Sequence, residues 1–136
     1  MSQELGFNVE LPLRFEAAVP RVRAALKEEG FGVLTEIDLK TTFKEKLGKE
    51  FHSYLILGAC NPPLAFSAIS ADPSVGLLLP CNVTVEWLAD ERTGVRLTDP
   101  EMLLSTMALA GDPQLAAVAR DGRERMTRVA ESLAKH

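Results

Sequence analysis

The feature that most constrains the fold is a succession of strand-like segments late in the chain, with no helix between them. Residues 76–80 and 81–88 form two apolar strand pieces divided by Pro80, and residues 95–97 follow a turn at Gly94. Proline cannot donate to a strand ladder, so we expect a bend, a bulge or a sheet edge at Pro80. Strands that succeed one another in this way indicate a largely antiparallel sheet.

Strands and helices alternate in the first half of the chain. Apolar residues at every second position predict strands over residues 7–13, 31–39 and 51–59. Helices are expected over residues 17–29 and within residues 38–48, ended by Gly30 and Gly48. Pro20 fits the first of them only if that helix begins near Ala17, because the first amides of a helix have no partner in any case.

Three later helices begin with a capping residue followed by proline. Asn61 and Pro62 precede a helix body over residues 64–71, and the same pairing recurs at residues 99–100 and 112–113. The last helix carries a stripe of apolar residues at helical spacing: Leu115, Val118, Met126, Val129 and Leu133. Gly122 lies on this stripe, which indicates close packing against a neighbouring element.

The order of these elements does not suit a doubly wound parallel sheet. We therefore predict an α+β fold, with a mostly antiparallel sheet and helices packed mainly on one face. No repeat and no linker rich in proline, glycine or serine divides the chain, so residues 1–136 are expected to form a single domain.

Composition and charge argue against several classes of partner. The net charge is −4, and the densest arginine group, within residues 120–128, is interleaved with acidic residues. We expect no nucleic-acid binding, because affinity for phosphate backbones comes mainly from clustered lysine and arginine. No apolar run approaches the roughly 20 residues of a membrane span, and the N-terminal residues do not resemble a secretory signal. The expected compartment is the cytoplasm, where two cysteines are expected as free thiols.

Two segments place a Cys-Asn pair at the end or break of a strand, and they supply the candidate ligand-binding residues. These residues are Cys60, Asn61, Cys81 and Asn82. Strand ends are common positions for binding sites. Both asparagines also have ordinary structural roles, as a helix cap or in a turn, so a ligand contact and a structural role remain open for each.

Cys60 directly precedes a helix cap, where the partial positive charge of a helix N-terminus favours a thiolate. Against a reactive thiol, Pro62 and Pro63 lack the N–H groups that would hold an anion, and cysteine is often simply a small buried residue. Two cysteines without a Cys-x-x-Cys motif fall short of the usual four zinc ligands, and the two histidines do not complete a set. We expect no metal and no cofactor, and the serines lack the setting of a catalytic triad.

Four spaced blocks of the chain resemble the domain-of-unknown-function family numbered 302. They cover residues 30–38, 43–48, 54–62 (ending in Gly-Ala-Cys-Asn-Pro) and 76–83. The resemblance implies a compact α+β domain and a homodimer. It assigns no reaction to the chain and no role to the Cys-Asn residues.

Three hypotheses about function follow. The preferred one is a dimeric domain that binds a small molecule near the two Cys-Asn segments. The second is a thiol-based enzyme or redox sensor that uses Cys60 with Cys81. The third is a structural or partner-binding module whose only functional surface is its dimer interface. The sequence does not decide whether a reaction is catalysed.

Overall fold

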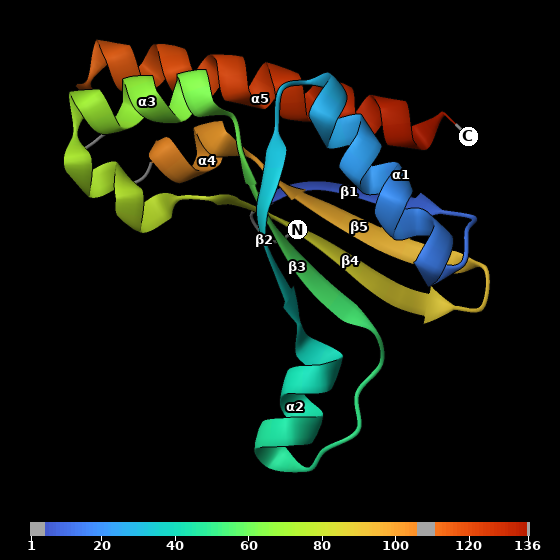
Figure 1. Ribbon diagram of the computed structural model, residues 1–136. Helices are drawn as coiled ribbons and strands as arrows, with labels where there is room; N and C mark the ends of the chain where they lie inside the picture. Colours follow the sequence, from blue (N-terminus) through green and yellow to red (C-terminus); the bar gives the residue numbers. More distant parts are fainter. Residues whose placement is uncertain (1–4, 106–110, 136) are drawn as a thin grey trace.

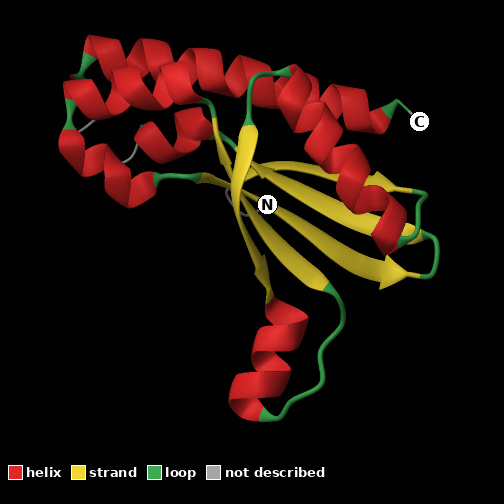
Figure 2. Ribbon diagram, in the orientation of Figure 1, coloured by secondary structure: helices red, strands yellow, loops and turns green. Residues whose placement is uncertain are grey.

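The structure is a computed structural model that describes residues 5–105 and 111–135. Its five strands form one sheet in the order β1-β5-β4-β3-β2, and every neighbouring pair is antiparallel (Figures 1 and 2). The strands are β1 (Gly6–Leu11), β2 (Gly32–Asp38), β3 (Tyr54–Cys60), β4 (Cys81–Ala89) and β5 (Arg92–Thr98). The helices are α1 (Phe15–Glu28), α2 (Leu39–Leu47), α3 (Pro62–Ala71), the 3-10 helix η1 (Pro73–Leu78), α4 (Pro100–Leu104) and α5 (Pro113–Ala134). The predicted α+β class is confirmed.

The main hydrophobic core lies between one face of the sheet and the helices α1 and α5. The sheet register places Leu57 opposite Val83 and Val83 opposite Leu97, so these three side chains line one face. Val22 of α1 and Met126 of α5 are fully buried against them. Burying one such side chain contributes about 1.5–3 kcal/mol, and the period-two pattern of the strands therefore determines which face the helices cover.

Beyond one end of the sheet, α3 and α4 pack on the first half of α5 and η1 packs on α3, and we call the group of α3, η1 and α4 the lobe (Figure 1). It has its own small core, made by Ala68, Val75, Leu104, Leu115 and Ala119. Gly122 explains how closely α4 approaches α5, because a Cβ atom at this position would lie 3.0 Å from Cγ of Pro100. The close packing predicted from the apolar stripe is confirmed.

Residues 38–53, which include α2, project from the opposite end of the sheet, and we call them the arm (Figure 1). Asp38 caps α2 by accepting a hydrogen bond from the Thr41 amide at 3.1 Å. Gly48 ends the helix in the left-handed conformation with φ of 66°, as the sequence predicted. No residue of α2 is buried.

The strand predicted over residues 76–80 is wrong. Residues 73–78 form η1, Leu79 is extended, and the chain bends at Pro80, as expected, before β4 begins at Cys81. An apolar run of this length does not distinguish a strand from a helix by its periodicity. The local signal was present, because Asp72 followed by Pro73 repeats the cap-plus-proline start of the other helices, and the Asp72 carboxylate accepts a hydrogen bond from the Ser74 amide at 2.9 Å.

Other boundaries also differ from the predictions, among them that of the first strand, which ends at Leu11 rather than at residue 13. The turn between β4 and β5 lies at residues 90–91, whereas Gly94 pairs with Glu86 in the middle of β5, beneath the side chain of Leu88. The third strand begins at residue 54 rather than 51. The first helix begins at Phe15, so Pro20 lies at an exposed position in its second turn, where it supplies no N–H for the carbonyl of Glu16 four residues earlier.

Candidate functional site

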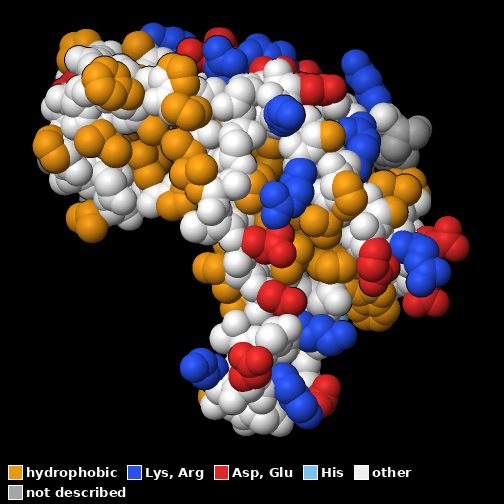
Figure 3. Space-filling view, viewed as in Figure 1, with side chains coloured by type: hydrophobic (Ala, Val, Ile, Leu, Met, Phe, Trp, Pro, Cys, Tyr) orange, Lys and Arg blue, Asp and Glu red, His pale blue; other side chains and the backbone are white. Residues whose placement is uncertain are grey.

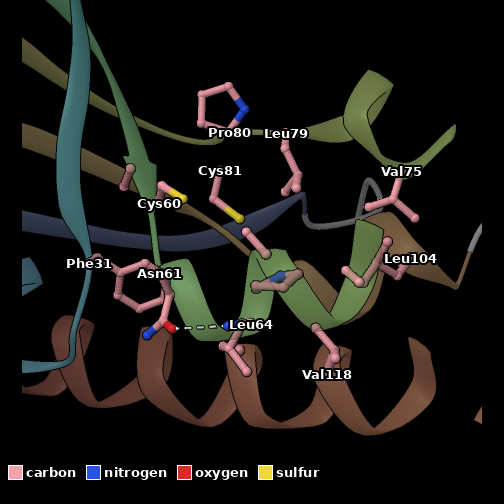
Figure 4. Close-up of a pocket in the computed structure, with 15 residues that line it drawn as sticks. Phe31, Cys60, Asn61, Leu64, Val75, Leu79, Pro80, Cys81, Leu104 and Val118 are labelled. Atoms are coloured by element: carbon pink, nitrogen blue, oxygen red, sulfur yellow. Dashed lines mark hydrogen bonds between the residues drawn. The ribbon is translucent and has the colours of Figure 1, made fainter. Parts of the chain in front are cut away.

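A cavity of about 50 Å³ lies where β3 ends and β4 begins, between the sheet and the lobe (Figure 4). Cys60, Asn61 and Cys81 border it, so the structure brings three of the four candidate residues to one place. The remaining described lining is apolar and comes from all the surrounding elements: Phe31, Ala59, Leu64, Ala65, Ala68, Val75, Leu79, Pro80, Pro100, Leu104, Val118 and Gly122. None of these residues carries a charge.

The antiparallel pairing of β3 with β4 is what brings the two cysteines together. Ala59 lies directly opposite Cys81, and Cys60 is the next residue along β3. The chain leaves β3 at Cys60 and, after α3 and η1, returns into β4 at Cys81, so both residues lie at the same end of the sheet. Figure 4 shows the two sulfur atoms on the cavity side of these strand ends. Both thiols are free.

Cys81 is a buried, protonated thiol at neutral pH. Its side chain is 8% exposed. Burial raises the pKa of the Cys81 thiol from 9.0 to about 11, and the neighbouring Cys60 thiol adds to this rise. The charged form of a thiol is disfavoured in apolar surroundings, so the geometry does not activate Cys81 as a nucleophile.

Cys60 is half-buried and stands immediately before the start of α3. Pro62 and Pro63 have no N–H group, and the amide of Leu64 donates to the Asn61 side chain at 3.3 Å. The first amides of α3 are therefore absent or already bonded. The hydrogen-bond donors that would stabilise a Cys60 thiolate at a helix N-terminus are missing, as the sequence indicated.

Asn61 borders the cavity, but both ends of its amide are already used. Its Oδ1 caps α3, and its Nδ2 donates to the backbone carbonyl of Glu29 at 3.2 Å. The same carbonyl accepts a hydrogen bond from Nη1 of Arg125 at 3.1 Å. Asn61 thereby joins the end of α1, the end of β3 and the start of α3. Its predicted role as a helix cap is confirmed.

Asn82 lies apart from the other three candidates. It is exposed, it sits opposite Gly58, and it is not part of the cavity lining. Side chains alternate between the faces of a strand, so the residue after the inward-facing Cys81 points to the face that no helix covers. Its backbone carbonyl accepts a hydrogen bond from the Thr98 hydroxyl at 2.5 Å.

The residues of the apolar cavity wall could not be predicted from the sequence. Phe31, Leu104 and Val118 come from three distant segments that meet only in the folded chain. Gly122 gave an indirect signal, since its place on an apolar stripe predicted a close neighbour, which is Pro100. Within residues 5–105 and 111–135, no group of three or more His, Cys, Asp or Glu side chains is arranged to hold a metal ion. None of the described helices is long and apolar enough to span a bilayer.

The fold places this chain among the α+β domains in which helices cover mainly one face of an antiparallel sheet. In this chain an apolar cavity bordered by two thiols lies at one end of that sheet. The model of the family described as Domain of unknown function DUF302 matches residues 7–133, and the chain belongs to this family. This membership confirms the resemblance seen in the four sequence blocks.

A solved structure agrees with this assignment. The crystal structure of an uncharacterized conserved DUF302 protein from Bacillus stearothermophilus is similar to this chain, with a TM-score of 0.81 and 27% sequence identity. The similarity covers 96% of this chain and 98% of that chain. A comparison with curated proteins finds no match.

Proposed function

We propose that this chain is a homodimeric domain that binds a small apolar ligand in the cavity bordered by Cys60, Asn61 and Cys81. The observation that carries the proposal is an apolar cavity at a strand end, whose polar groups free of a backbone partner are two thiols. Binding sites are typically concave and mainly apolar, with few polar groups that orient the ligand. Cys60 and Cys81 would contact the ligand. Asn61 would fix the start of α3 in its position beside the cavity.

The size of the cavity limits the ligand. A volume of about 50 Å³ exceeds the roughly 30 Å³ that one water molecule occupies in the liquid, and it is well below the roughly 150 Å³ of an engineered cavity that binds benzene. The ligand would therefore place a group of two or three heavy atoms, such as a short alkyl or thioether group, against the thiols. Asn82 lies outside this proposal because it faces away from the cavity.

Thermal unfolding with a panel of two- to four-carbon thiols, sulfides, alcohols and alkyl amines tests the proposal. A bound ligand stabilises the folded state by about 2.7 kcal/mol at 100 times its Kd, so the apolar members should raise the Tm and the charged amines should not. Ala65→Val adds two carbon atoms to the lining and should abolish the shift. Ser70→Val on the exposed side of the same helix is the matched control. A panel without effect on the wild-type protein contradicts the proposal.

A second candidate function is thiol redox chemistry, which the two thiols on one cavity favour. An alkyl hydroperoxide would oxidise Cys60 to a sulfenic acid and leave as the alcohol. The Cys81 thiol would then displace water to form a disulfide. Measuring the alkylation rate of Cys60 against pH in a Cys81→Ser background tests this candidate. A Cys60 thiol that titrates at or above about 8.5 argues against an activated nucleophile.

The homodimer is tested separately, by light scattering during gel filtration of the wild-type protein. A dimer at micromolar concentration supports it, and a monomer contradicts it. A dimer that binds no member of the panel and has no activated thiol would favour the third hypothesis, a structural or partner-binding module.

A further inference from the structure

The arm has no hydrophobic core of its own. All of residues 32–54 are described by the structure, and none of them is buried. Phe43 packs edge-on against Phe51 with ring centroids 5.2 Å apart, but Leu47 remains 62% exposed. A helix of nine residues is marginal in water by itself, because most helical stability in proteins comes from packing of an apolar face. The arm therefore presents apolar side chains, above all Leu47, that the described chain leaves largely uncovered.

The lobe has an uncovered apolar surface of its own. Figure 3 shows hydrophobic side chains gathered over the region where Figure 1 places α3 and η1. Phe66 is 77% exposed and Leu77 is 89% exposed, and Ile69 lies on the same helix as Phe66. Exposed apolar patches of this kind mark interaction surfaces in soluble domains. The outer side of α3 is thus largely apolar and uncovered, although it also carries Ser70.

The arm and the lobe differ in their balance of acidic and basic residues. Over α3 and η1, residues 62–78, the chain has one acidic residue, Asp72, and no lysine or arginine. The arm carries four lysines against three acidic residues, although the whole chain has a net charge of −4. The arm is thus slightly basic on an acidic protein. The net negative charge of a second copy would attract the arm, and α3 and η1 carry no lysine or arginine that would repel it.

We propose that the arm of one copy docks against the lobe of a second copy, and that the same contact is repeated about a two-fold axis. Figure 3 shows the molecule hollowed between the lobe and the arm, which leaves room for a partner's arm. A two-fold interface is self-complementary, so one arm and one lobe per chain satisfy both uncovered surfaces. This inference rests on the proposed homodimer and specifies its interface. It is independent of ligand binding in the cavity.

A lipid surface fits these observations less well. Surfaces that lie on membranes combine apolar residues with lysine and arginine that contact anionic headgroups. Residues 51–85 contain no lysine or arginine. Four of the six lysines in the sequence are instead on the arm, at the opposite end of the sheet from the lobe (Figure 1). A second copy brings these two regions together, whereas a flat bilayer does not.

Sedimentation equilibrium of the full chain and three exposed-leucine variants tests the inference. Leu47→Lys places a charge on the arm, and Leu77→Lys places one on the lobe; each should raise the dimer Kd at least tenfold. Leu5→Lys alters a leucine that is 78% exposed but belongs to neither surface, and it should leave the dimer Kd unchanged. Circular dichroism confirms that each variant is folded, which their high exposure favours.

The outcomes separate this inference from the proposals on which it rests. A wild-type protein that stays monomeric at 100 µM overturns both the homodimer and this interface. A wild-type protein that sediments with phosphatidylcholine vesicles, and that Leu77→Lys releases from them, overturns the assignment of the lobe to a second copy. A wild-type dimer that tolerates Leu47→Lys or Leu77→Lys as well as it tolerates Leu5→Lys overturns the arm–lobe contact alone. The ligand panel addresses the cavity, and its result does not depend on either outcome.

Discussion

At the scale of single residues, Asn61 holds more of the structure together than either cysteine does. Its amide caps α3 and bonds to the end of α1, while its backbone follows the last residue of β3. Gly30 makes this contact possible, because its φ of 85° turns the chain after α1, and a Cβ atom there would lie 2.9 Å from Nδ2 of Asn61. The two Cys-Asn segments therefore differ, since Asn61 is structural and Asn82 is solvent-facing.

We expect Asn61→Ala to destabilise the protein by about 1–3 kcal/mol, because the substitution removes a helix cap and a buried hydrogen bond. Urea denaturation measures the change. Asn82→Ala is the matched control on an exposed position and should stay within about 0.5 kcal/mol of the wild type. Equal effects of the two substitutions would contradict the structural role of Asn61.

Cys81 makes stability depend on pH in the alkaline range. Its folded pKa of about 11 lies above its ordinary value of 9.0, so between these values the folded state keeps a proton that the unfolded state has lost. Stability from this group is therefore complete below pH 9 and falls as the pH rises toward 11, by about 2–3 kcal/mol in total. The stability difference between the wild type and Cys81→Ala, measured at pH 7 and pH 10.5, should shrink at the higher pH. A difference that does not change with pH contradicts the burial of a protonated thiol.

At the scale of elements, the residues at the two ends of α2 account for where this helix begins and ends. It has a capping aspartate at one end and a left-handed glycine at the other, with no buried residue between them. We expect Gly48→Ala to weaken this helix by about 1 kcal/mol, since an L-residue is strained at a φ of 66°. Amide hydrogen exchange at Thr42 and Phe43 should become faster. Gly76→Ala, which meets no atom within 4 Å and has no positive φ, is the control.

The same local signals explain how far the sequence could predict the fold. Asn61, Asp99 and Asp112 each cap a helix through the side chain, as their pairing with proline indicated. Alternation predicted β3, in which Leu55, Leu57 and Ala59 are buried, and an apolar run after Pro80 predicted β4. Residues 76–80 were assigned wrongly because their apolar run outweighed the Asp72-Pro73 start of η1. Prediction therefore succeeded where a signal is local and failed where a uniform apolar run hides one.

The candidate site could be predicted only in part, for a related reason. Cys60 and Cys81 were expected at a shared concavity because each marks a strand end, and the antiparallel register places them together. The rest of the wall comes from Phe31, Leu104 and Val118, which are far apart in the sequence. Their meeting depends on how the lobe packs against α5, and no periodic pattern within one element encodes that packing.

At the scale of the whole molecule, the lobe would serve two sites at once. The inner side of α3 and η1 lines the cavity through Leu64 and Val75, and their outer side carries the exposed apolar patch with Phe66 and Leu77. A ligand that moves this wall would change the fit of a second copy on its other side. By linkage, dimerisation would then change the affinity for the ligand by the same factor.

This coupling can be measured with the most stabilising member of the small-molecule panel. If the proposed dimer forms, we expect that compound to change the dimer Kd of the wild-type protein. We also expect Leu77→Lys, which the arm–lobe interface predicts to weaken the dimer, to shift the ligand affinity in the corresponding direction. Sedimentation and calorimetry give the two affinities. Affinities that are independent of each other would mean that the lobe wall does not transmit the change.

The central claim is that two strand ends bring Cys60 and Cys81 to one cavity that a small apolar guest can enter. A crystal structure determined under xenon pressure tests it most directly, since xenon occupies apolar cavities and scatters X-rays strongly. We predict a xenon atom bordered by both sulfur atoms and by Leu64 of α3. A structure in which side chains fill this space, or in which the two sulfur atoms face different surroundings, would contradict the account.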